Sequence, residues 1–419
     1  MNKKIYNNLI KINSLFLYIL PISLVTGPFI PNLIVTLVCF VGLFLIIYNK
    51  QLKHYFNNSF FKFFLIFSIY LIINSILNKN FNLNGASGYI YLRYIIFSVV
   101  IWHTLENNIN FYKNFTRIIL IFVLLLFIDS IFQYFNETDL LGIQKSSYGK
   151  ISSVFGIKVK LGAYLARVYI FVFIFIYLFL DKKLLNIVYL NIVNFLFITI
   201  ILFTGERTSF FIFFLNFFII NLTTRERLFN KITNFLVIVL ISVIILANIK
   251  DVKTRYIDNT FMQVKDSNMN NSSYHIFSKV HEMHYRIAYK MFSDSKFFGQ
   301  GLNSFRILCG EEKFKISANN EGCSTHPHNI YIQLLGETGL IGFLFLLVAF
   351  FYIYSLFAIQ ILNIIKKNKN FKNRIYFYGP IVVYLFPFMP TGNFLNSWVN
   401  IMIYLPMGFL LYEVYSKND

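Results

Sequence analysis

The feature that most constrains this chain is its succession of long apolar stretches, because lipid accepts only segments whose backbone polar groups bond internally. An apolar helix needs about 20 residues to cross the hydrocarbon core of a bilayer. About twelve windows suit this purpose, the first of them short. They are residues 14–26, 32–48, 60–77, 89–105, 118–135, 163–180, 185–203, 209–222, 233–249, 340–361, 375–389 and 399–415. The sequence therefore predicts an all-α polytopic membrane protein.

The composition excludes several other classes of protein. Hydrophobic residues make up 57% of the chain, charged residues only 13%, and the mean hydropathy is +0.61. A soluble enzyme, a disordered chain and a disulfide-rich miniprotein would each have a different composition. The net charge of +20 would suggest nucleic acid in a soluble protein. In a membrane protein, such basic residues are first explained by the loops on the two sides of the membrane, because they set the orientation of the spans. We therefore expect a lipid bilayer as partner and no nucleic acid.

The distribution of Lys and Arg predicts which loops face the cytoplasm. Basic residues gather in alternate loops, which stay inside under the positive-inside rule. They are Lys3, Lys4 and Lys11; Lys50 and Lys53; Lys113 and Arg117; Lys182 and Lys183; Arg225, Arg227 and Lys231; and Lys366, Lys367, Lys369, Lys372 and Arg374. We expect both termini in the cytoplasm. Spans 1 to 9 would occupy residues 1–249, an outside loop residues 250–339, and spans 10 to 12 residues 340–419.

Two outside segments carry positive charge against this rule. One is residues 250–327, the larger segment outside the membrane, and the other is residues 136–161. The second segment holds four lysines, Lys145, Lys150, Lys158 and Lys160. Such charge indicates either an anionic ligand, for example a phosphate-bearing lipid, or a solvated loop beside anionic headgroups.

Cysteine usage favours a disulfide over a metal site. Cys39 lies in an expected span and is most simply a buried apolar residue. Cys309 and Cys323 both fall in the outside loop, where an oxidising milieu would allow them to form a disulfide. No Cys-x-x-Cys pair occurs, and the seven His form no metal-like pattern with Cys or carboxylates. We therefore expect no metal.

The densest group of chemically active residues lies just before the tenth span. Ser324 or Thr325 could cap a helix whose first turn contains Pro327, and this short helix would end near Gly336 and Gly339. His326 and His328 would then sit at a helix N-terminus. That end disfavours imidazolium and binds phosphate or carboxylate. A neutral base beside an anion site suits glycosyl or phosphoryl transfer. The alternative is two interfacial histidines in a re-entrant turn.

Charged residues elsewhere provide further candidates. Glu206 and Arg207 form a minimal connection between two spans, either as a diphosphate site or as a structural pair. The helical spacing of apolar residues in 281–292 predicts an amphipathic helix outside the membrane, and this helix contains Arg286. His281, Glu282 and His284 at its start do not have the spacing of a HExxH zinc motif. Residues 298–302 predict a turn and not a dinucleotide fingerprint. Within the spans, Arg93 is either functional, or it snorkels to the membrane surface or pairs with a carboxylate such as the intramembrane Asp129.

Together these features resemble the O-antigen ligase/polymerase family of bacterial envelope proteins. The resemblance covers roughly residues 140–350, including the large outside loop between spans nine and ten. It rests on Gly205-Glu206-Arg207-Thr208, on Arg286…Phe292…Gly299-Gln300-Gly301, and on His326-Pro327-His328-Asn329-Ile330-Tyr331…Glu337-Thr338-Gly339…Gly342.

The resemblance implies a metal-independent, inverting glycosyltransferase of the GT-C type, without a cofactor, at the periplasmic face of the bacterial inner membrane. The donor would be a glycan on undecaprenyl diphosphate, with the polyprenyl chain in an apolar groove between spans. Arg207 and Arg286 would bind the diphosphate. His328, or else His326, would activate the acceptor hydroxyl. The supporting residues would be Glu206, Asn329 and Glu337.

Three activities share this pattern and differ in their acceptor. A ligase transfers the glycan to lipid A–core, a polymerase to a lipid-linked repeat unit, and a protein oligosaccharyltransferase to Ser or Thr. We expect a ligase, with an O-antigen polymerase as the alternative. A modest outside loop disfavours the protein acceptor. A lipid-linked glycan transporter is the hypothesis from another class, favoured only if Arg93 and Asp129 face a central water-filled cavity.

Overall fold

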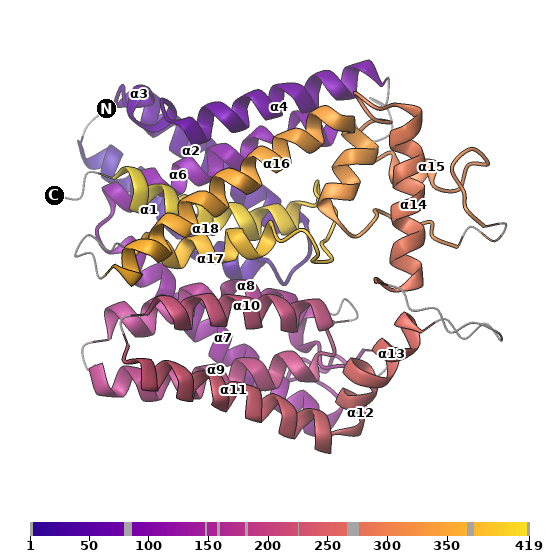
Figure 1. Cartoon of the computed structure of the whole chain (residues 1–419). Helices are drawn as coiled ribbons and strands as arrows, with labels where there is room; N and C mark the ends of the chain where they lie inside the picture. The colour runs from indigo at the N-terminus through magenta and orange to yellow at the C-terminus, as the bar shows by residue number, and fades with distance from the viewer. Residues whose placement is uncertain are drawn as a thin grey trace.

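The computed structural model is helical throughout (Figure 1). It describes residues 3–78, 86–146, 149–156, 160–180, 183–224, 226–265, 276–317, 319, 321–366 and 373–416. Within these ranges there is no β-strand, only isolated bridges between Thr138 and Gln144 and between Ser146 and Lys150. The prediction of an all-α protein is confirmed.

Each expected span overlaps a long helix. These helices are α1 (Lys3–Ser23), α2 (Phe29–Tyr48), α4 (Ser59–Leu77), α6 (Leu92–Asn107), α7 (Phe111–Asn136), α8 (Leu161–Ile174), α9 (Lys183–Phe203), α10 (Arg207–Thr223), α11 (Leu228–Asn248), α16 (Ile330–Ile365), α17 (Arg374–Tyr384) and α18 (Ser397–Tyr415). In the described part of the chain, seven helices are long and apolar enough to cross a membrane: α2, α4, α7, α8 with its continuation, α11, α16 and α18. The chain is therefore a polytopic membrane protein.

Shorter elements connect the long helices. They are α3 (Leu52–Phe56), α5 (Ala86–Tyr89), η2 (Ser153–Phe155), η3 (Phe175–Phe179), α12 (Lys250–Lys253), η4 (Thr254–Asp258), α13 (Asn259–Val264), α14 (Lys279–Asp294) and α15 (Phe305–Leu308). Both chain ends lie at one end of the bundle, and α12 to α15 lie at the opposite end (Figure 1). The segment between α11 and α16 is thus separated from the termini by the length of the bundle.

Several expected loop cations are not described. Lys158, Lys182, Arg225, Lys367, Lys369 and Lys372 lie outside the described residues, as does the side chain of Lys183.

Small residues allow the central helices to approach closely. A Cβ atom on Gly42 of α2 would lie 2.2 Å from Val100 Cγ1 of α6. A Cβ atom on Gly408 of α18 would lie 2.6 Å from the Cβ of Ile101, also in α6. Because lipid gives no hydrophobic drive for helices to associate, such close packing supplies much of the attraction between them. Helix α6 is accordingly buried along most of its length between α2 and α18.

Helix α16 changes direction at Gly339, where φ is +66° and ψ is −164°. The sequence predicted a short helix that ends near Gly336 or Gly339, followed by a separate span. The structure confirms this break, because one helix ends at the non-helical residue Gly339 and another begins directly after it. The turn after α14 supplies hydrogen bonds there: Gln300 N donates to Gly336 O (3.1 Å), and Leu340 N donates to Lys296 O (2.8 Å). Backbone groups freed by the break therefore remain bonded.

The two intramembrane charges do not pair with each other. Arg93 Nη2 donates to Asn32 Oδ1 (2.7 Å) and so links α6 to α2. Asp129 accepts hydrogen bonds from Leu140 N (2.8 Å) and from Ser153 Oγ. Pairing of Arg93 with Asp129, one of the alternatives considered from the sequence, does not occur, because each group is bonded by another polar partner. Asp129 instead holds the segment between α7 and α8 against α7.

Candidate active site

Four histidines from two parts of the segment between α11 and α16 meet at one end of the bundle. His281 and His284 lie on α14, whereas His326 and His328 lie just before α16. The ring centroid of His328 is 4.1 Å from that of His326 and 5.5 Å from those of both His281 and His284. We call these four residues the histidine cluster. Among the residues described, no three His, Cys, Asp or Glu side chains are arranged to hold a metal ion.

The backbone at His328 sets the start of α16. The sequence predicted a cap at Ser324 or Thr325, but the cap is Asn329, whose Oδ1 accepts a hydrogen bond from Tyr331 N (2.9 Å). His328 has a φ of +60°, a left-handed conformation that an α-helix does not contain. The helix therefore begins after His328, and the capping side chain of Asn329 gives this residue a structural role.

Hydrogen bonds distinguish the two histidines of the HPH sequence. His326 Nε2 lies 3.2 Å from Thr391 O, and its Nδ1 lies 2.9 Å from Thr325 Oγ1. A carbonyl only accepts, so Nε2 of His326 carries the proton and Nδ1 accepts from the threonine hydroxyl. His328 has one weak contact, from Nε2 to Ser324 Oγ at 3.4 Å. Within the described residues its other ring nitrogen is unengaged, which favours His328 as the base.

Both histidines are neutral near pH 7. Burial, with a further contribution from His326, lowers the pKa of His328 to about 3. Burial also lowers the pKa of His326 to about 4. A buried imidazole loses hydration that the charged form needs, and neighbouring histidines would repel that charge. His328 is therefore unprotonated across the physiological pH range, and a ring nitrogen has its lone pair available.

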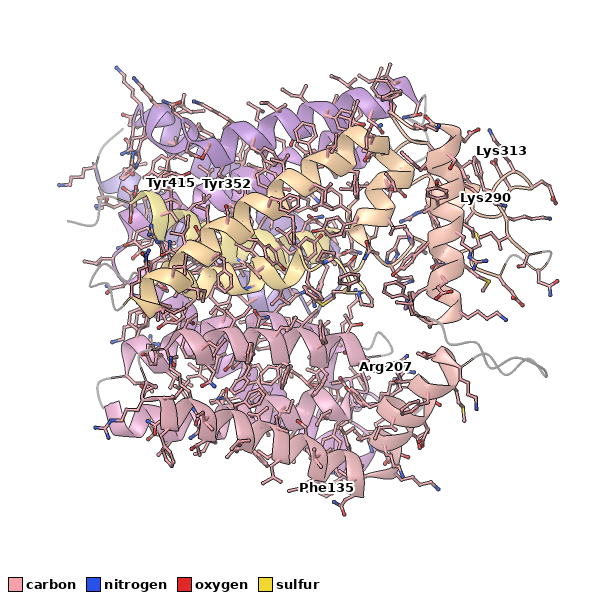
Figure 2. All side chains as sticks on the ribbon, viewed as in Figure 1. Phe135, Arg207, Lys290, Lys313, Tyr352 and Tyr415 are labelled. Atoms are coloured by element: carbon pink, nitrogen blue, oxygen red, sulfur yellow. A yellow bond between two sulfur atoms is a disulfide. The ribbon has the colours of Figure 1, made fainter. Side chains whose placement is uncertain are left out.

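Arg207 opens α10 beside the histidine cluster. Its Nη1 donates to Thr260 Oγ1 (2.8 Å) and its Nη2 to Gln263 Oε1 (2.7 Å), both on α13. These bonds orient the guanidinium. Figure 2 shows Arg207 at the loop end of α10, near the end of α14 where that helix begins. Burial, His284 and then the charge of Arg207 lower the pKa of His281, so Arg207 and the cluster share one electrostatic environment.

Glu206 has a different partner from the one expected. The sequence predicted that it would pair with Arg207 or position it. Instead Glu206 Oε1 accepts from Gly162 N (2.9 Å) and Oε2 from Ala163 N (3.2 Å), at the first turn of α8. Ser209 Oγ also donates to this carboxylate (2.7 Å). A carboxylate is stabilised there because unpaired N–H groups at a helix N-terminus bind negative charge. Glu206 therefore ties α10 to α8.

Two further cations approach the turn before Arg207, and sequence reasoning did not single them out together. Arg255 Nε donates to Gly205 O (3.1 Å). A Cβ atom on Gly205 would lie 3.5 Å from Lys150 Cε, which places this lysine along the same turn. Burial and then Arg255 lower the pKa of Lys150. One indication of these cations was present in the sequence, because both lie in the positively charged segments predicted outside the membrane. Their proximity to Arg207 suits the binding of a multiply charged anion.

Arg286 is not part of this arrangement. It is exposed, and among the described residues it makes no hydrogen bond or ion pair. Five residues along a helix rotate a side chain by about 140°, so Arg286 faces away from His281. Lys290, one turn further along, lies on the side of α14 away from the bundle (Figure 2) and donates to Lys315 O (2.9 Å). The geometry gives no support to joint binding of a diphosphate by Arg207 and Arg286.

Glu337 supports the segment between α14 and α16, and within the residues that the structure describes it makes no hydrogen bond to the histidine cluster. Its side chain is 1% exposed. Its Oε2 accepts from Gln333 Nε2 (3.0 Å), its Oε1 from Phe305 N (3.3 Å), and its carbonyl from Gly301 N (2.8 Å). These bonds fasten the start of α15 and the preceding turn to α16.

A disulfide joins Cys309 and Cys323, with a Cα–Cα distance of 5.1 Å. It closes the loop that leads into the histidine cluster. We expect the double variant Cys309→Ser/Cys323→Ser to lower the free energy of unfolding by about 3 kcal/mol, because a cross-link over a loop of this length restricts the unfolded chain. Thermal unfolding in detergent with and without reductant measures this. A wild-type protein that reductant leaves unchanged, and whose thiols react equally before and after reduction, would show that no disulfide forms.

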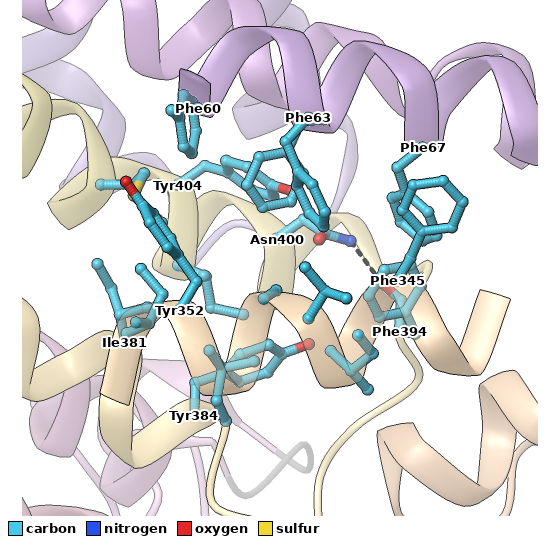
Figure 3. A pocket seen from close by; sticks show the side chains of 18 of the residues that line it. Phe60, Phe63, Phe67, Phe345, Tyr352, Ile381, Tyr384, Phe394, Asn400 and Tyr404 are labelled. Atoms are coloured by element: carbon cyan, nitrogen blue, oxygen red, sulfur yellow. Dashed lines mark hydrogen bonds between the residues drawn. The ribbon is translucent and has the colours of Figure 1, made fainter. Parts of the chain in front are cut away.

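An apolar cavity of about 230 Å³ lies between α4, α16, α17 and α18. Figure 3 shows its aromatic lining, with Phe63 and Phe67 from α4, Tyr352 from α16 and Tyr404 from α18. The one hydrogen bond drawn there, from Asn400 Nδ2 to Phe394 O (2.8 Å), lies at its edge. The lining suits a hydrocarbon chain.

A comparison with known families decides what the site belongs to. Residues 192–347, from within α9 to the middle of α16, match the family model described as O-antigen ligase. Residues 192–347 are therefore similar to an O-antigen ligase domain, and we call this matched stretch the O-antigen ligase domain. This O-antigen ligase domain contains Arg207, Arg255 and the whole histidine cluster. Proteins of this family are glycosyltransferase-like enzymes of the bacterial inner membrane. The family predicted from the sequence is confirmed; no curated protein matches the chain.

Proposed function

We propose that this protein is a periplasmic-face glycosyltransferase that moves a glycan from undecaprenyl diphosphate to an acceptor hydroxyl. The leading acceptor is lipid A–core, which makes the protein an O-antigen ligase. The observation that carries the proposal is the position of His328. It is a neutral, weakly bonded imidazole in a cluster that shares its electrostatic environment with Arg207, inside the O-antigen ligase domain.

The chemistry follows from these two groups. His328 takes the proton of the acceptor hydroxyl as the oxygen attacks the anomeric carbon. The bond from that carbon to the diphosphate oxygen breaks, and its electron pair stays on the diphosphate. Arg207, with Arg255 and Lys150 nearby, stabilises the charge that develops on the leaving group. A single displacement of this kind inverts the anomeric carbon and requires no metal.

The topology supports this direction of transfer. All twelve long helices cross the membrane in the proposal, so that both termini lie in the cytoplasm and α14 lies in the periplasm. The terminal ends and α14 occupy opposite ends of the bundle (Figure 1). The apolar cavity between α4 and α16 accepts part of the polyprenyl chain, since its lining is almost wholly hydrocarbon and aromatic.

A reconstitution with two acceptors tests the proposal. Purified protein in lipid receives undecaprenyl-diphosphate oligosaccharide, either with lipid A–core or alone. We expect product on lipid A–core, as for a ligase. A ladder on the polyprenyl carrier without core would instead identify a polymerase. Absence of product in both arms, from a protein that unfolds cooperatively, would contradict glycosyl transfer and favour a transporter.

A further inference from the structure

The start of its own helix positions the ring of His281. Ser278 caps α14, and its Oγ accepts the backbone N–H of His281 (3.4 Å). The same oxygen lies 3.0 Å from His281 Nδ1. The serine hydroxyl can donate its one proton to Nδ1 while its oxygen accepts from the backbone N–H. The ring proton of His281 is then on Nε2, which has no partner among the described residues.

His281 stands between the two parts of the site. Its ring centroid is 5.5 Å from that of His328, at an interplanar angle of 65°. The charge of Arg207 also acts on it, and Figure 2 shows Arg207 near the end of α14 where that helix begins. The first N–H groups of a 16-residue helix add positive potential at this end. His281 is therefore close both to the proposed base, His328, and to the proposed diphosphate site at Arg207.

The geometry points to His281 as a further catalytic residue that donates a hydrogen bond from Nε2–H to the leaving diphosphate oxygen, beside Arg207. This inference rests on the proposed function. It replaces Arg286, which faces away, with a residue that the fold directs into the site. The acceptor proton passes to His328, the electron pair of the broken C–O bond stays on the diphosphate, and His281 keeps its own proton. The two histidines thus act on opposite sides of the same displacement.

His284 provides a matched control on the same helix. Its ring lies as close to His328 as that of His281, at 5.5 Å. However, it is 4% exposed, and its Nδ1 lies 2.6 Å from Gly322 O, a carbonyl that can only accept. His284 therefore fastens the end of the disulfide-closed loop, just before Cys323, to α14. We expect its replacement to lower stability, in contrast to that of His281.

The test compares His281→Ala, His281→Gln and His284→Ala with wild type. For His281→Ala we expect kcat to fall about 100-fold, the usual effect of losing one preorganised donor, with a nearly unchanged melting temperature. His281→Gln should recover to within about 10-fold of wild type, because an amide N–H can replace Nε2–H. Direct binding of undecaprenyl diphosphate, measured with undecaprenyl monophosphate as the comparison, should weaken about 10-fold in His281→Ala, as expected for a lost hydrogen bond to a charged group.

Several results would overturn this inference. One is a His281→Ala variant with wild-type kcat and wild-type binding of undecaprenyl diphosphate. Another is an equal loss of activity in His281→Ala and His281→Gln, accompanied in both by a melting temperature as low as that of His284→Ala. That result would make His281 a structural residue. A wild-type protein that transfers nothing, yet binds undecaprenyl diphosphate more tightly than His281→Ala, would contradict the proposed function while supporting the diphosphate contact.

Discussion

A His328→Ala variant is expected to insert normally and to lose glycosyl transfer by about 10²- to 10⁴-fold, the contribution of a positioned general base. His328 has an unengaged ring nitrogen, whereas both nitrogens of His326 are bonded. The initial rate of product formation in reconstituted vesicles measures the effect. His326→Gln is the matched comparison, and we expect a smaller loss of about 10-fold because its role is to hold the segment through Thr391.

The pH dependence of kcat/KM checks the same assignment. The pKa of His328 is lowered to about 3, so the imidazole is unprotonated at every pH above that value. We therefore expect kcat/KM to show no acid limb from His328 between pH 5 and pH 8. An acid limb near pH 6.5, removed in His326→Gln but present in wild type, would show that His326 is the base. Wild-type transfer by a stable His328→Ala variant would also refute the assignment.

Gly339→Ala is expected to lower the free energy of unfolding by about 4 kcal/mol, the range reached when backbone strain and a backbone clash combine. A Cβ atom there would lie 2.4 Å from Phe297 O, and the φ of +66° disfavours any side chain. The hydrogen bond from Leu340 N to Lys296 O would have to lengthen as the two backbones separate. The position of the His326–His328 segment depends on this crossing, because α16 begins directly after it.

Thermal unfolding in detergent and the yield of folded protein from membranes measure the effect. Gly379→Ala in α17 is the control, since its Cβ atom would meet its nearest neighbours at 3.5 and 3.6 Å, an ordinary contact. We expect that variant to match wild type. If Gly339→Ala were as stable as Gly379→Ala, the backbone contact between α16 and the turn after α14 would not exist as described.

Local properties of the sequence were enough for much of this protein. The apolar windows correspond to helices because burial in lipid is decided residue by residue along a segment. The HPH sequence stood out because its histidines were predicted at a helix N-terminus, which binds anions. Arg207 stood out because a charge at the membrane edge is costly unless it is used or bonded. The pairing of Cys309 with Cys323 in the structure agrees with their shared place in the outside loop.

Partners of charged residues, in contrast, were decided by the tertiary structure. Glu206 bonds to α8 and not to its neighbour Arg207, and Asp129 bonds to the segment before α8 and not to Arg93. His281 reaches His328 across more than forty residues of sequence. Hydropathy states which segments enter the membrane, but helix packing and the break at Gly339 determine which ends become neighbours. The sequence by itself therefore specified the helices and the reactive residue types, and only packing between distant segments brought those residues into one site.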